Sequence, residues 1–102
     1  MKTITVVQLH PSSNSLKKWM VTFPNNHATH FGAQGYQDYT QHRNPDRKER
    51  YITRHRANEN WTRSGIETAG FWSRWLLWEK PSLEDAIKNI EKKFDLKIMR
   101  AR

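Results

Sequence analysis

The fold class is decided near the C-terminal end of the chain, by Ser82-Leu83-Glu84-Asp85-Ala86-Ile87-Lys88-Asn89-Ile90-Glu91-Lys92-Lys93-Phe94-Asp95-Leu96-Lys97-Ile98-Met99. Its first four residues resemble a capping box, with an acid at the third helical position. Leu83, Ile87, Ile90 and Phe94 then recur at helical spacing, while residues 96–99 alternate as a strand does. This stretch therefore predicts a helix followed by a short strand, so the domain combines both kinds of element.

The N-terminal third of the chain predicts strands. Residues 3–9 are rich in β-branched side chains, and Pro11 with the polar residues after it interrupts them. Residues 17–23 alternate, with Trp19, Val21 and Phe23 on one face, and a turn at residues 24–26 follows. Residues 17–31 are therefore expected to form an antiparallel hairpin.

Two helices are expected between this hairpin and Ser82. Gly32 and Gly35 mark a connection with positive φ or a close backbone approach. Asn44 caps a helix that starts at Pro45 and runs to about residue 57. Thr68 caps another, apolar around most of its circumference, which ends at Lys80-Pro81 and must lie centrally.

This element order predicts one α+β domain over residues 1–102. A small, mainly antiparallel sheet, made of the hairpin and the terminal strands, carries about three helices packed on one face. The chain is short enough for a single core, and its five Trp, four Phe and three Tyr argue against disorder.

The composition limits the classes of function. The chain has no cysteine, so disulfides and thiolate metal sites are excluded, and it lacks a signal-peptide or membrane-spanning stretch. We therefore expect a protein of the cell interior or a virion, neither secreted nor inserted in a membrane. Eighteen Lys and Arg against ten Asp and Glu give a net charge of +8, which favours an anionic partner.

A stripe of arginines is the sharpest candidate site. The spacings within Arg43, Arg47, Arg50 and Arg54 are four, three and four, which places them on one side of the helix that starts at Pro45. Lys48 and Arg56 flank the stripe. Two interpretations stay open: a surface that binds phosphates or an acidic protein, and an ordinary solvated helix face.

Aromatic residues form the second candidate, in the run Phe71-Trp72-Ser73-Arg74-Trp75-Leu76-Leu77-Trp78. Arg74 is a further candidate for binding an anionic partner, and the rings beside it can stack on bases or anchor an interface. A domain of this size also needs large side chains for its core, and that interpretation is favoured for most of the run. Trp72 and Trp78 are proposed as the rings that reach a partner.

Enzymatic and metal sites are weaker candidates. His27 and His30, with His42 and His55, suggest a metal site, but the cysteine and the His-Glu-x-x-His spacing of common zinc sites are missing. A one-metal nuclease built from His42, Asn44, His55 and Asn58 is a remote alternative. We therefore expect no catalysis, no cofactor and no metal.

Three long runs resemble a family of short uncharacterised proteins encoded by giant and other large DNA viruses of eukaryotes. The runs are residues 31–40, 45–55 and 68–81, and the resemblance extends over about residues 17–94. It implies a viral origin and carries no functional residues.

The expected function is that of a non-catalytic virion component, either a minor capsid protein or a protein associated with the genome. It would bind viral structural proteins or nucleic acid, with DNA favoured over RNA. The alternative is a nucleic-acid-binding module that acts during infection.

Overall fold

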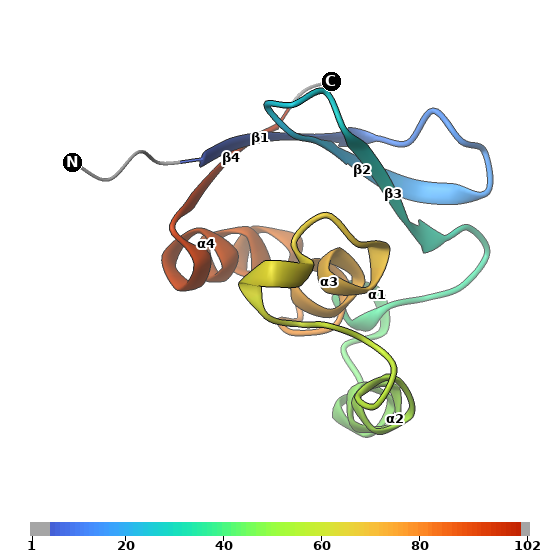
Figure 1. The fold of residues 1–102 in the computed structure, drawn as a ribbon. Helices are drawn as coiled ribbons and strands as arrows, with labels where there is room; N and C mark the ends of the chain where they lie inside the picture. Colours follow the sequence, from blue (N-terminus) through green and yellow to red (C-terminus); the bar gives the residue numbers. More distant parts are fainter. Residues whose placement is uncertain (1–4, 101–102) are drawn as a thin grey trace.

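The computed structural model describes residues 5–100 and shows a four-stranded sheet with every helix on one side (Figure 1). The strand order is β3-β2-β1-β4, from β1 (Thr5–Pro11), β2 (Lys17–Thr22), β3 (Ala28–Ala33) and β4 (Leu96–Arg100). β1 pairs antiparallel with β2, β2 pairs antiparallel with β3, and β4 lies parallel to β1. The sheet is therefore mixed but mainly antiparallel, as the sequence predicts.

The helical elements are α1 (Tyr39–His42), α2 (Pro45–His55), a 3₁₀ turn (Arg63–Gly65), α3 (Ala69–Trp72), a π-helical segment (Ser73–Leu77) and α4 (Leu83–Phe94). Three of them, α2, α3 and α4, begin at the caps that the sequence indicates. Asn44, Thr68 and Ser82 each accept a backbone N–H of the first turn that follows. These side chains satisfy donors that a helix start leaves unpaired, and so they set where α2, α3 and α4 begin.

The core lies between the sheet and the layer of helices made by α3 and α4. Val7 and Leu9 of β1, Val21 of β2 and Phe31 of β3 point into it and are at most 1% exposed. From the helices, Phe71, Trp72, Leu76 and Ile90 fill it and are completely buried. The alternation of apolar residues along the strands selects this inner face.

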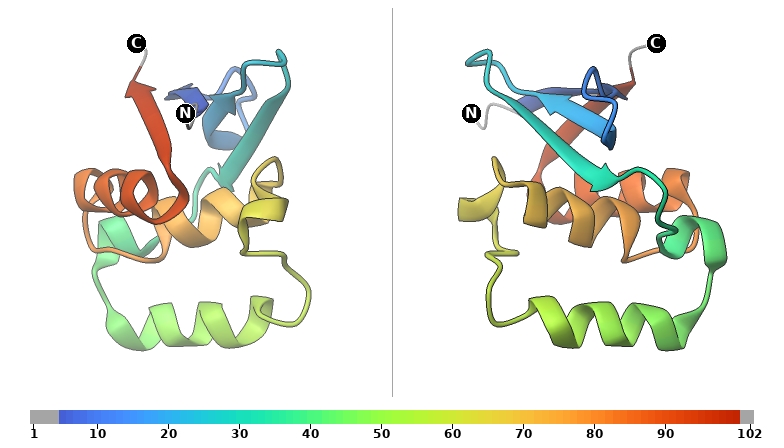
Figure 2. Two further views of the ribbon diagram at one scale, coloured as in Figure 1. Left: turned by 60° about the vertical axis from the view of Figure 1, so that its left-hand side comes forward. Right: turned by 90° about the vertical axis from the view of Figure 1, so that its right-hand side faces the viewer.

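α2 lies farther from the sheet than α3 does, as a separate outer rod joined to the body at both of its ends (Figure 2). Its inward side chains Tyr51 and Ile52 are buried. The prediction of helices on one face of the sheet is confirmed. However, α2 does not pack on the sheet itself, because it lies beyond α3, on the side away from the sheet (Figure 2). The helix also ends at His55, two residues before the expected end.

Two features of the connections were not expected. A short helix, α1, starts at Asp38, which forms a full capping box with Gln41. The apolar helix after Thr68 changes at Ser73 from α-helical to π-helical winding. Gly32 and Gly35 do take positive φ, at 78° and 86°, as predicted.

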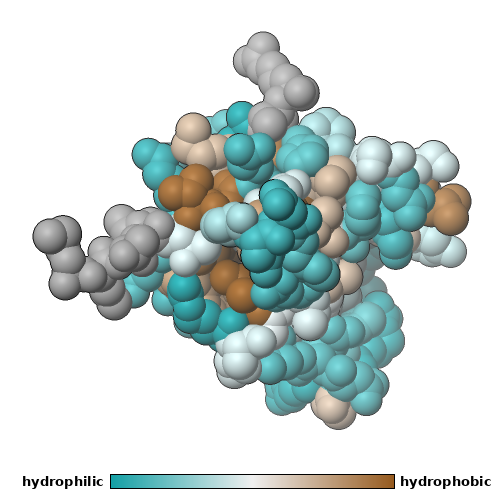
Figure 3. Space-filling view, turned by 45° about the horizontal axis from the view of Figure 1, so that its top comes forward, coloured by the Kyte–Doolittle hydropathy of each residue, from teal (hydrophilic) through white to brown (hydrophobic). Residues whose placement is uncertain are grey.

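The outer face of the sheet is mostly hydrophilic, and the hydrophobic areas seen on it are small and separated (Figure 3). The strand residues Val6 and Met99 are its large exposed apolar side chains, at 44% and 47%. Within residues 5–100, no helix is both long and apolar enough to cross a bilayer. The start of the expected first strand at residues 3–4 and the basic tail at residues 101–102 lie outside the described residues.

Candidate functional site

Three of the predicted arginines line one hollow on the surface. Arg47, Arg50 and Arg54 of α2 surround a cavity of about 210 Å³ together with Tyr36, Gln37 and Trp78. Arg47 Nη1 lies 3.5 Å from Gln37 Oε1, and among residues 5–100 none of these three arginines forms an ion pair. The hollow therefore combines three uncompensated positive charges with two aromatic rings.

A larger groove of about 370 Å³ adjoins this hollow and shares Tyr36, Gln37 and Trp78 with it. The groove runs between the end of β3, the inner side of α2 and the start of α3. Glu59 and Gly70 both line it and lie in contact, because the Glu59 carboxylate occupies the space that a Cβ at residue 70 would need. The two cavities together form one continuous site in which cationic and polar groups alternate with rings.

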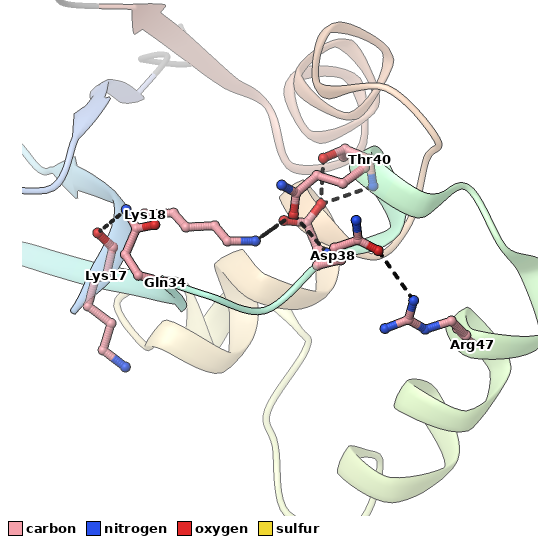
Figure 4. Close-up of polar contacts among 8 residues, drawn as sticks. Lys17, Lys18, Gln34, Asp38, Thr40 and Arg47 are labelled. Atoms are coloured by element: carbon pink, nitrogen blue, oxygen red, sulfur yellow. Dashed lines mark hydrogen bonds and ion pairs between the residues drawn. The ribbon is translucent and has the colours of Figure 1, made fainter. Parts of the chain in front are cut away.

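The loop that carries Tyr36 is fastened at both ends. At one end, Gln34 donates its backbone N–H to Leu16 O and its side-chain amide to Lys17 O. At the other end, Asp38 is buried and receives Lys18 Nζ at 2.8 Å (Figure 4). Tyr36 lies between these ends with 74% of its surface exposed, so a rigid loop presents an aromatic ring to solvent.

An aromatic stack joins α2 to the body and forms one wall of the site. Tyr51 of α2 lies parallel to Trp78, with ring centroids 4.5 Å apart and an interplanar angle of 2°. Trp61 and His55 stack on Tyr51 as well, and His42 lies 5.2 Å from Trp78. Burial, with the Glu59 charge adding to it, raises the pKa of Tyr51, so its phenol stays neutral.

An ionic cluster holds α2 at a second point. Glu79 Oε1 lies 2.7 Å from Arg74 Nη1 and 3.5 Å from Lys48 Nζ, and Lys48 also donates to Glu79 O. Partial burial would by itself raise the pKa of Glu79. The hydrogen bond and charge of Arg74, with Lys48 adding to them, outweigh burial and hold that pKa below its ordinary value.

The Glu79 cluster should make stability sensitive to acid. A carboxyl whose folded-state pKa is depressed contributes stability above its unfolded pKa of 4.5 and loses it as the pH falls through the folded value. We expect the free energy of unfolding to drop as the pH is lowered below about 4.5, and to drop less in Glu79→Gln. Urea unfolding at a series of pH values measures this, and identical acid limbs in both proteins would contradict it.

Several predicted site residues lie elsewhere. Trp72 is completely buried against Phe31 and Phe71, so the prediction that it anchors a partner is wrong. Arg74 and Lys48 form ion pairs with Glu79. The Arg74 guanidinium also lies over the Trp75 ring, and its side chain is only 12% exposed. These two cations stabilise the body of the domain instead of extending the free arginine surface.

Two further cations of the predicted stripe lie outside α2. Arg43 takes positive φ as the C-cap of α1 and donates Nε to Pro81 O, because Asn44 and Pro45 start a new helix after it. Arg56 is the exposed C-cap of α2, beyond the hollow. The free arginine face (Arg47, Arg50 and Arg54) is therefore shorter than the sequence suggested.

The histidines are dispersed. His27 lies 3.8 Å from Glu67, and His30 hydrogen-bonds Ser12. His42 lies against Trp78 and accepts the backbone N–H of Asn44, whereas His55 stacks on Tyr51 and lies 3.6 Å from Glu59. Burial, and next the Arg47 charge, lowers the pKa of His42. Among residues 5–100, no group of three or more His, Asp or Glu is arranged to hold a metal ion.

Sequence reasoning missed Tyr36, Gln37 and Glu59 as members of the site. Tyr36 could have been identified, because it directly follows Gly35 in a connection where two glycines adopt positive φ. No sequence pattern identifies Glu59, because only the fold brings it into contact with Gly70.

Residues 7–55 match a known family, described as a family of unknown function (DUF5754). The matched part is just under half of the chain and runs from β1 to the end of α2, so it includes Tyr36 and the free arginine face but not Trp78. No curated protein and no solved structure matches the chain. The match indicates similarity to an uncharacterised family and brings no activity with it.

Proposed function

We propose that this protein is a non-catalytic nucleic-acid-binding domain that uses the free arginine face of α2. The observation that carries the proposal is the set of three arginines without acidic partners in the described part of the chain, gathered around one hollow with Tyr36 and Trp78. Guanidinium groups suit phosphate oxygens because they donate hydrogen bonds in pairs. The rings beside them can stack on bases.

The electrostatics of the whole chain support the same partner. A net charge of +8 attracts a polyanion from a distance, and phosphates are the commonest contact in such complexes. Like charges spaced three or four residues apart on a helix repel one another, and a bound phosphate chain relieves that repulsion. A bound polyanion therefore lowers the repulsion among the arginines, which a solvated helix face would leave in place.

The viral setting belongs to the same proposal. The resemblance to proteins of large DNA viruses, together with a phosphate-binding surface, favours a protein associated with the viral genome, and DNA over RNA, in the virion or the infected cell. A minor capsid role through apolar anchors has less support, since Trp72 is buried and the outer sheet face is mostly hydrophilic. Absence of the protein from purified particles would remove the virion part of the proposal.

The direct test is fluorescence anisotropy of labelled single-stranded and duplex DNA, titrated at salt concentrations from about 50 to 200 mM. We expect binding whose logarithm falls linearly with log salt, with a slope of about −0.7 per phosphate on a single strand and −0.9 on a duplex. Slopes that correspond to about three or more phosphates would match the arginine face. No binding at the lowest salt would refute the proposal.

A further inference from the structure

The hollow and the groove share one wall, made by Tyr36, Gln37 and Trp78, and so a single ligand can enter both. We infer that together they form a site for one unpaired nucleotide of a single strand, with its phosphate in the arginine hollow and its base in the groove against Tyr36. This inference rests on the proposed function and goes further, because it names the state of the strand and the residue that recognises the base.

The charges along the site set the orientation of this nucleotide. Arg47, Arg50 and Arg54 lie at the outer end, where they attract a phosphate. Glu59 lies in the groove, with its carboxylate 3.6 Å from His55 and packed on Gly70. Lys17 and Lys18 also line the groove, and Lys18 is paired with Asp38. The groove therefore carries one acid and one lysine without an ion pair among the described residues, whereas the hollow carries three free arginines. The hollow is the more positive end, so the phosphate is placed there and the neutral base is left for the groove.

Tyr36 supplies the flat surface that a base requires. Its ring is 74% exposed and makes no ring contact within residues 5–100, unlike Tyr51, which lies in a stack. The bonds at Gln34 and Asp38 hold the loop in place, so presenting the ring costs little ordering when a strand binds. Stacking on an exposed ring tolerates any base, so we expect binding without sequence preference.

Polar groups around the groove can contact the edges of that base. The side-chain carbonyl oxygen of Gln37 accepts a hydrogen bond from Arg47, and the amide N–H groups of Gln37 have no partner among the described residues. The hydroxyl of Ser73 lines the groove and likewise has no side-chain partner there. The volume of about 370 Å³ lies within the range of small-ligand sites, so a base and its sugar find room.

Duplex nucleic acid cannot use the groove in the same way. Its bases are stacked and paired, and turning one out requires several kcal/mol of unstacking and unpairing free energy. A duplex can still place its phosphates on the free arginine face. The site therefore predicts binding to both forms, with a preference for the single strand that comes from the base and Tyr36.

The test compares three labelled ligands: oligo-dT, an abasic single strand with the same length and number of phosphates, and a duplex of that length, which carries twice as many phosphates. For the full chain we expect oligo-dT to bind about five- to a hundredfold more tightly than the abasic strand, the range for one stacked base. Tyr36→Ala should abolish this difference, because oligo-dT loses the ring on which its base stacks. Tyr36→Phe keeps the ring and should keep the preference.

Leu16→Ala is the matched control, because Leu16 is equally exposed, at 72%, on a different loop. Equal affinity for oligo-dT and the abasic strand, or a preference that survives in Tyr36→Ala, would overturn the inference and leave the proposed function standing. No binding to any of the three ligands would instead refute the proposed function. If free dTMP displaced labelled oligo-dT at concentrations as low as those of the oligomer, the site would be one for a free nucleotide. That result would overturn the inference that it binds a nucleotide within a strand.

Discussion

Replacing Arg47, Arg50 and Arg54 together by Gln is expected to weaken the binding of single-stranded DNA by more than about 100-fold at low salt. Each arginine loses a charge-assisted contact to phosphate, and about 1 kcal/mol for each is enough for that factor. The slope of log affinity against log salt should become shallower by about 2, since three contacts on a single strand account for about 0.7 each. Fluorescence anisotropy over a salt series measures both quantities.

The matched control removes the same charge elsewhere. Lys88, Lys92 and Lys97 are exposed on α4 and β4, far along the chain from α2, and form no ion pair with the described residues. Their joint replacement by Gln should change affinity by less than about tenfold, through the net charge alone. Both triple variants should keep the stability of the parent within about 1 kcal/mol, because their side chains lie at the surface. Equal losses of binding in the two variants would show that the arginine face has no special part.

Trp72→Ala is expected to destabilise the domain by about 3–5 kcal/mol, the cost of removing a large ring from a packed core. Trp72 is completely buried, its rings contact Phe23, Phe31 and Phe71, and its indole N–H donates to Ile66 O at 2.7 Å. A loss of this size is a large share of the total stability of a small domain. Urea unfolding followed by far-UV circular dichroism measures it.

The comparison for this prediction is Tyr36→Ala, which removes an exposed ring. Its free energy of unfolding should stay within about 0.5 kcal/mol of the parent value. The two substitutions therefore separate a ring that builds the core from a ring that faces the solvent. A loss below about 1 kcal/mol in Trp72→Ala would mean that the ring does not pack as the structure places it.

Much of the fold could be predicted, because its signals are local. The caps at Asn44, Thr68 and Ser82 act on backbone groups within three residues, so the starts of α2, α3 and α4 follow from the sequence. The alternation in β2 and the turn after Phe23 likewise predicted the hairpin. The π-helical turn after Trp72 carries no comparable local signal, and it was missed.

The candidate site could be predicted only in part. The free arginine face was visible because its three residues share one helix, where spacing alone determines the side they occupy. Arg74 looked equally free, and only the fold shows that Glu79 neutralises it. Trp72 and Trp78 are both tryptophans of one aromatic run, yet one is in the core and the other lines the site.

The sequence by itself determined an α+β domain, the positions of its helix starts and a positively charged stripe on α2, since each depends on residues close together in the chain. Tertiary structure alone decided that β4 pairs parallel with β1 and that α2 lies beyond α3. It also brought Tyr36 and Glu59 into the lining of one groove. These arrangements depend on contacts between segments that are distant in the sequence. The free energies of such contacts come from packing and from paired charges, which a local sequence pattern does not predict.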